Sequence, residues 1–134
     1  EIVFGKTYEV LQNCTAALVT SGTATLETAI LRVPQVVCYY IACGKFVSFL
    51  RKHLLKVPYI SLVNLVANKE VVTELVAHLM NVDNVKKEIA DILPGGSKRQ
   101  QMLEDYEEMN RILGGAGASE RAAKAMIETL SKNR

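Results

Sequence analysis

The run Ser21-Gly22-Thr23-Ala24-Thr25 has the residue types of a phosphate-binding corner, because it follows an apolar stretch and opens a helical pattern. The first amide N–H groups of a helix lack partners within the helix, and the helix dipole adds positive charge there, so an anion is favoured. Gly22 leaves the backbone open to a ligand, the three hydroxyls are donors, and Ala24 keeps the first turn narrow. The pattern predicts a seat for a phosphate group.

Glu27 follows one turn later, four residues after Thr23 and therefore on a similar face of the helix. A carboxylate repels phosphate, but it readily accepts hydrogen bonds from the two hydroxyls of a ribose, as in the dinucleotide-binding folds. The corner and the carboxylate together predict a nucleoside diphosphate as the ligand. An ordinary strand-to-helix turn with a capping side chain explains the same residues, and chemistry alone leaves that alternative open.

Nucleophilic catalysis by Ser21 fits the sequence less well. The serine lacks the G-x-S-x-G elbow, and neither His53 nor His78 has a recognisable orienting acid. The histidines lie in no ligand cluster, and no two cysteines have the C-x-x-C spacing of a zinc or redox site. We therefore expect no metal ion and no other cofactor.

The elements that would position these residues alternate between strands and helices. Four apolar runs predict strands at residues 2–4, 16–20, 35–40 and 59–62. Helical spacing of apolar residues predicts helices over 7–13, 23–32, 45–56, 69–80 and 83–93. This alternation is typical of an α/β fold with a Rossmann-like, mostly parallel sheet flanked by helices.

The composition changes after Pro94-Gly95-Gly96. A charged helix is predicted from Ser97, and glycines 114, 115 and 117 form a linker to a last helix from Ser119. We expect two regions, a Rossmann-like part at residues 1–96 and a helical tail at 97–134. The tail should pack on the first region or on a neighbouring domain through two apolar stripes: Met102, Tyr106, Met109 and Leu113, then Ala123, Met126, Ile127 and Leu130.

The overall composition is that of one ordinary globular domain of 134 residues with a net charge of +2. So small a charge gives no reason to expect nucleic acid as a partner. No apolar run approaches the roughly 18 residues that a membrane span needs, and no secretory signal is recognisable. Three cysteines in or beside apolar runs fit a reducing cytoplasm.

Two stretches resemble the carboxy-terminal domain of the lipid-A-disaccharide synthase family. The first, "AALVTSGTATLETAILRVPQVVCYY", carries the family's S-G-T-A-T-L-E run, a proline and a valine-rich strand. The second, "YISLVNLVANKEVVTELVAHLMN", carries its Ser-Leu-x-Asn-Leu core. With a similar tail around Tyr106 and "GASERAA", the resemblance covers nearly the whole chain.

The resemblance implies a two-domain GT-B glycosyltransferase, of which this chain is the part that binds the UDP-sugar. The family joins UDP-2,3-diacylglucosamine to 2,3-diacylglucosamine 1-phosphate with inversion and releases UDP. On this basis Glu27 would accept from the uridine ribose, and Asn64 would lie in the same donor site. Tyr40 and Glu74 would lie near the same cleft. The pyrophosphate would be held by Ser21, Gly22, Thr23, Ala24 and Thr25.

The same resemblance implies that the acceptor domain, with the family's catalytic aspartate, lies before Glu1. No catalytic residue is then expected in this chain, and alone it should not transfer sugar. A sheet without its central strands could be completed by exchange of elements between two copies, so a homodimer is expected. Many members have proline where this chain has Thr73, and because others lack it too, this departure changes little.

Residues 45–56 intersperse basic side chains with phenylalanines and leucines, as in surfaces that contact anionic lipid at the inner membrane. Core packing with a solvated charged face explains the same pattern, so a cytoplasmic protein with peripheral membrane contact is one of two alternatives. Two further functions also stay open: another UDP-sugar transferase or epimerase of the same architecture, and a nucleotide-binding or scaffolding module without catalysis.

Overall fold

A three-stranded parallel sheet organises the computed structural model, which describes residues 1–20, 22–39, 59–114 and 117–132. The strands β1 (Ala17–Val19), β2 (Gln35–Tyr39) and β3 (Glu74–Val76) lie in the order β1-β2-β3. The register pairs Val19 with Val37, and Val37 with Glu74. The central strand β2 is buried from Gln35 to Cys38, as its uninterrupted apolar pattern predicts.

Two of the four predicted strands are wrong. Residues 2–4 form no strand, and the side chains of Ile2 and Phe4 are 83% and 85% exposed. Residues 59–62 lead instead into the helix α4 (Leu62–Ala67), whose first turn is capped by Ser61. The Ser61 hydroxyl oxygen accepts from the backbone N–H of Asn64 at 3.4 Å. Serine is a favoured residue at the start of a helix, and this capping signal outweighs the short apolar run.

The third strand lies where the sequence predicts a helix, residues 69–80. The apolar residues of that segment recur at helical spacing, but the buried amide of Asn64 accepts from the backbone N–H groups of Val71 and Val72 at 2.8 and 2.9 Å. These N–H groups are therefore not available for the hydrogen bonds of a helix. The chain continues as β3 against β2 and then makes a single turn, η1 (Ala77–Leu79).

The remaining helices lie close to their predicted ranges. They are α1 (Thr7–Gln12), α2 (Gly22–Ile30), α5 (Val82–Ile92), α6 (Arg99–Leu113) and α7 (Ala118–Lys132). Asn81 caps α5 by accepting from the backbone N–H of Asn84 at 2.9 Å. The helix predicted over residues 45–56 lies outside the described residues.

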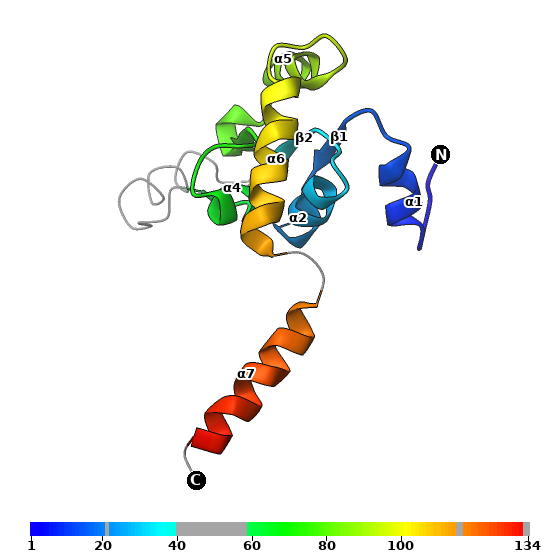
Figure 1. The fold of residues 1–134 in the computed structure, drawn as a ribbon. Coiled ribbons are helices and arrows are strands. Elements are labelled where there is room, and N and C mark those ends of the chain that lie inside the picture. Colours follow the sequence, from blue (N-terminus) through cyan, green and yellow to red (C-terminus); the bar gives the residue numbers. More distant parts are fainter. Residues whose placement is uncertain (21, 40–58, 115–116, 133–134) are drawn as a thin grey trace.

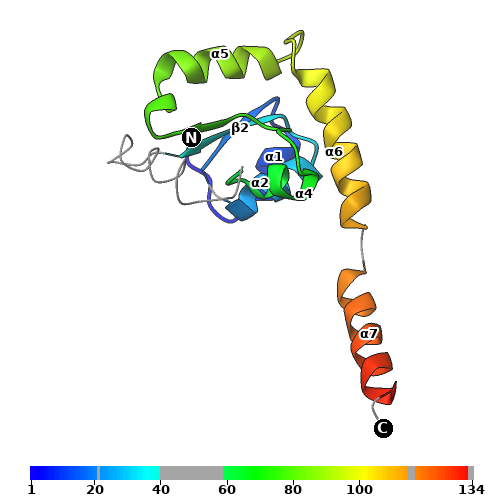
Figure 2. The ribbon, with the colours of Figure 1, turned by 90° about the vertical axis from the view of Figure 1, so that its left-hand side faces the viewer.

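The helices cover the sheet on both faces (Figure 2), with α5 on one side and α2 and α4 on the other. Helix α6 runs along the side of these layers and contacts α2 and α4. Its predicted stripe is confirmed, because Met102, Tyr106 and Met109 are buried in the common core. Helix α7 extends away from this body (Figure 1), and every described residue in it is exposed.

No helix among the described residues combines the length and the apolar character that a membrane span requires.

Candidate functional site

The predicted corner lies where β1 gives way to α2, at the carboxyl edge of the parallel sheet. Helix α2 begins at Gly22, three residues after β1 ends at Val19. In open α/β sheets, ligands bind outside the carboxyl ends of the strands. A Cβ at Gly22 would meet no atom of the described residues within 4 Å, so in this part of the structure the backbone is open to an approaching group. The first turn of α2 therefore has the position and the access that an anion seat needs.

The side chains of this turn differ in how far they reach the surface. Thr23 is exposed and Ala24 is half-buried, whereas Thr25 is fully buried. The Thr25 hydroxyl donates to the Gly22 carbonyl oxygen at 2.5 Å, so its proton is used within the helix. Thr23 is thus the described residue of this turn whose hydroxyl faces solvent. Ser21 lies outside the described residues.

Glu27 lies on α2 one turn further on and is half-buried. Its Oε1 accepts a hydrogen bond of 3.0 Å from the hydroxyl of Tyr8, which belongs to α1. This bond to a carboxylate, together with the negative charge of Glu27, raises the pKa of the Tyr8 phenol. Sequence reasoning missed Tyr8 as a neighbour of Glu27, because 19 residues separate the two and no local pattern links them.

Asn64 is buried, and its side-chain amide makes four hydrogen bonds within the chain. Nδ2 donates to the Val72 carbonyl oxygen at 2.8 Å and to Glu74 Oε1 at 3.1 Å, while Oδ1 accepts from the backbone N–H groups of Val71 and Val72. An amide has two N–H donors and two acceptor lone pairs, so this capacity is fully used. Asn64 therefore fastens α4 to the segment that enters β3.

The Glu74 carboxylate lies beside Asn64 and caps the start of α4. It accepts from the backbone N–H groups of Ile60 and Ser61, and Ser61 Oγ donates to its Oε1 at 2.8 Å. A negative charge is favoured at this helix end because the first amides lack partners. The structure thus brings two predicted site residues, Asn64 and Glu74, into one cluster. The predicted residue Tyr40 lies outside the described residues.

A cavity of about 410 Å³ opens next to this cluster, between β3 and α5. Its described lining includes Asn64 and Glu74 but none of residues 22–27. Among the described residues, the corner at Gly22 and the Asn64–Glu74 cluster therefore do not line the same cavity. The described residues that line it are Tyr59, Asn64, Glu70, Thr73, Glu74, Leu75, Leu79, Asn84, Lys87 and Glu88.

Glu88 is a second carboxylate in the lining of this cavity, after Glu74, that accepts hydrogen bonds from within the chain. Burial works against its charge, but hydrogen bonds from Lys98 and Thr73, at 2.5 and 2.8 Å, lower the Glu88 pKa overall. Glu74 accepts from backbone amides, so the oxygens of both carboxylates are engaged by donors within the chain. This arrangement favours a structural role over general acid catalysis at the cavity. No group of three or more metal-ligating side chains occurs within the described ranges.

Comparison with known proteins places this geometry in context. The family model described as lipid-A-disaccharide synthetase matches residues 2–129. A lipid-A-disaccharide synthase of Myxococcus xanthus is 35% identical over 133 residues, which are 99% of this chain and 34% of that protein. The corresponding proteins of Syntrophus aciditrophicus and Psychromonas ingrahamii are 36% and 34% identical over 98% and 100% of this chain, and 34% of each of them. The chain spans about a third of the length of these relatives.

Proposed function

Because this chain belongs to the lipid-A-disaccharide synthetase family, we propose that it is the donor-binding part of a glycosyltransferase that builds the lipid A disaccharide. The proposed donor is UDP-2,3-diacylglucosamine, the acceptor is 2,3-diacylglucosamine 1-phosphate, and UDP is released. One observation supports the donor site above others: the first turn of α2 begins at an uncovered Gly22, at the carboxyl edge of the sheet, with Glu27 one turn behind.

The first turn of α2 would act on the leaving group. As the bond to the sugar breaks, UDP gains negative charge at its diphosphate, and backbone N–H groups aimed there stabilise the transition state more than the ground state. Gly22, Thr23 and Ala24, with Ser21, would supply these donors. Thr25 would contribute its hydroxyl only after leaving its bond to the Gly22 carbonyl oxygen.

Glu27 would read the uridine by accepting hydrogen bonds from the ribose hydroxyls. Its half-buried carboxylate lies one turn from the proposed phosphate seat, and such charge-assisted bonds are stronger than neutral ones. Asn64, Glu74 and Tyr40 are the further proposed donor-site residues. The internal hydrogen bonds of Asn64 and Glu74 point to an indirect contribution, in which they hold the segments around the site.

The remaining parts of the proposal concern the whole protein. The catalytic aspartate and the acceptor site would lie in the part of the family that this chain does not span, so the chain alone would not transfer sugar. The protein would work in the cytoplasm, in peripheral contact with the inner membrane. The homodimer with exchanged elements is proposed only for the present chain on its own, whose sheet would lack the family's central strands.

One alternative function has an observation in its favour. Thr25, Asn64 and Glu74 all make hydrogen bonds within the chain, as expected for a scaffolding module in which the corner is only structural. Another UDP-sugar transferase or epimerase is the alternative within enzymes. Competition between acylated and unacylated UDP-sugars would separate that alternative from the proposed donor.

Calorimetry with UDP, carried out on the full natural protein that contains these residues, tests the proposed donor site. Glu27→Ala should weaken UDP binding about tenfold or more, because a hydrogen bond to a charged group contributes roughly 1.5–3 kcal/mol. Glu120→Ala, the same change on the exposed helix α7, is the control and should leave binding unchanged. An absence of binding heat, with no loss on Glu27→Ala, would support the scaffold instead.

A further inference from the structure

We propose that Tyr8 is a positioning residue for Glu27, holding its carboxylate in the orientation that accepts the ribose hydroxyls. This inference rests on the proposed function, in which Glu27 reads the ribose. It adds a residue outside the resembling motif, on a separate helix, to the recognition of the donor.

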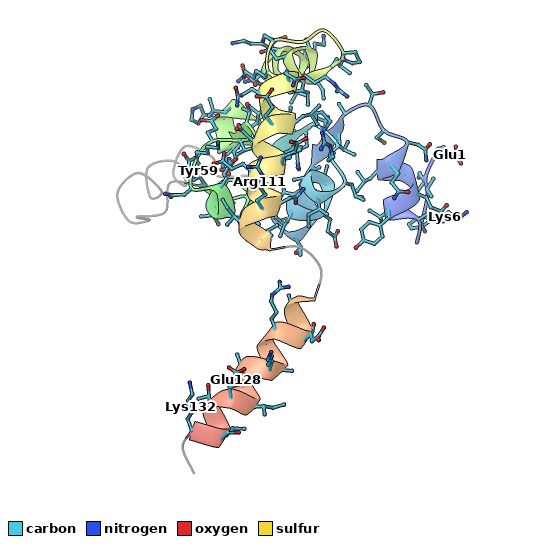
Figure 3. All side chains as sticks on the ribbon, viewed as in Figure 1. Glu1, Lys6, Tyr59, Arg111, Glu128 and Lys132 are labelled. Atoms are coloured by element: carbon cyan, nitrogen blue, oxygen red, sulfur yellow. The ribbon has the colours of Figure 1, made fainter. Side chains whose placement is uncertain are left out.

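The contact joins the body to α1, which lies at its outer edge, where Figure 3 labels Lys6 at the start of this helix. The Tyr8 hydroxyl on α1 donates to Glu27 Oε1 on α2 at 3.0 Å. Helix α1 has no buried residue, and the Tyr8 side chain is 56% exposed. Tyr8 therefore contributes little to core packing. Its hydroxyl contacts Glu27, the residue that is proposed to bind the ribose.

The hydrogen-bonding capacity of the carboxylate leaves room for a ligand. An ionised glutamate has two oxygens with about four acceptor positions, and Tyr8 occupies one of those on Oε1. Within the described part of the chain, Oε2 and a second position on Oε1 stay available for two neighbouring hydroxyls. A phenol can only donate its proton to a carboxylate while it stays protonated, and the contact raises the Tyr8 pKa in the direction that preserves this state.

The benefit of the contact is preorganisation. A glutamate side chain on a helix surface has three torsions, and ordering it on binding reduces affinity. A carboxylate already held by a phenol has less freedom to lose. Loss of the hydroxyl should therefore weaken ligands that use the ribose hydroxyls, and should matter less for a ligand that lacks one of them.

The experiment compares UDP with 2′-deoxy-UDP, again in the full natural protein that contains these residues. The unchanged protein should prefer UDP, and Glu27→Ala should remove that preference. Tyr8→Phe keeps the ring but deletes the hydroxyl, and it should reduce the preference about threefold to tenfold, the range expected for one hydrogen bond to a charged group at a partly exposed site. Glu9→Gln, an exposed change on the same helix, is the control and should keep the full preference.

A double variant tests whether Tyr8 acts through Glu27. In the Glu27→Ala background, Tyr8→Phe should have no further effect on either ligand, because the partner of the hydroxyl is already gone. A further loss there, or an equal weakening of both ligands by Tyr8→Phe alone, would assign Tyr8 a merely structural role and overturn the inference.

The two proposals fail in different ways. If Glu27→Ala removes the preference and Tyr8→Phe keeps it, Glu27 reads the ribose without help from Tyr8, and only the present inference is overturned. If Glu27→Ala leaves the preference unchanged, Glu27 does not bind the ribose, and the proposed role of Glu27 in the donor site fails together with the role of Tyr8.

Discussion

Asn64 shows how one side chain can decide the path of a segment. Its amide takes the N–H groups of Val71 and Val72 and the carbonyl oxygen of Val72, which would otherwise need partners in a helix or a strand. With Glu74 as its fourth partner, it ties α4 to β3. Asn64, which we propose for the donor site, thus holds two segments of the fold together.

Removing this amide should destabilise the fold strongly. Asn64→Ala leaves buried backbone groups without partners, each costing about 1–3 kcal/mol, so we expect a loss of roughly 3 kcal/mol or more in the free energy of unfolding. Urea unfolding followed by circular dichroism measures it. Asn110→Ala, an asparagine on α6, is the matched control and should change stability by less than about 0.5 kcal/mol. A stable Asn64→Ala protein that has lost only UDP affinity would contradict this role in the fold and favour direct ligand contact.

Among the elements, α6 contributes most clearly to the core. Tyr106 is fully buried at the centre of its inner stripe, and its hydroxyl lies 3.3 Å from Gln35 Nε2 of β2. Burial raises the Tyr106 pKa, so the phenol stays neutral and serves as a hydrogen-bonding group inside the protein. The Gln35 amide also donates to the Thr25 carbonyl oxygen, so α2, β2 and α6 meet at one buried polar contact.

Truncation of Tyr106 should therefore weaken the body as a whole. Tyr106→Ala removes a buried ring and leaves a cavity, and comparable changes cost about 3–5 kcal/mol. Ile112→Ala, on the same helix but at a side chain that is 59% exposed, should cost little. Thermal unfolding of both variants measures the difference. Equal melting temperatures would show that α6 is not integral to the fold.

At the scale of the whole molecule, the chain divides into a packed body and an extended last helix. The side chains of Met126, Ile127 and Leu130 on α7 are 66%, 65% and 70% exposed, so the predicted stripe of this helix meets no described part of the chain. Helices of about 15 residues are marginal on their own, since most helical stability comes from packing. The stability of the body should then be independent of α7.

A chain ending at Gly114 tests that independence. We expect its urea midpoint to match that of the 134-residue chain, because α7 adds no buried residue. A chain ending at Gly96 is the contrasting variant and should fail to fold, since it loses the buried Met102, Tyr106 and Met109. A large drop in the midpoint on removing α7 alone would mean that this helix packs against the body in solution.

Local signals in the sequence determined the two-sided burial of the strand at 35–39, the stripe of α6 and the helix starts near residues 7, 22 and 82. They also predicted the corner at Gly22 and Glu27, because capping, glycine and periodicity act over a few neighbouring residues. The tertiary structure alone decided that residues 74–76 form a strand, that Asn64 and Glu74 bind each other, and that Tyr8 reaches Glu27. Each of these depends on a partner 10 or more residues away along the chain, where the free energy of a long-range contact outweighs local propensity.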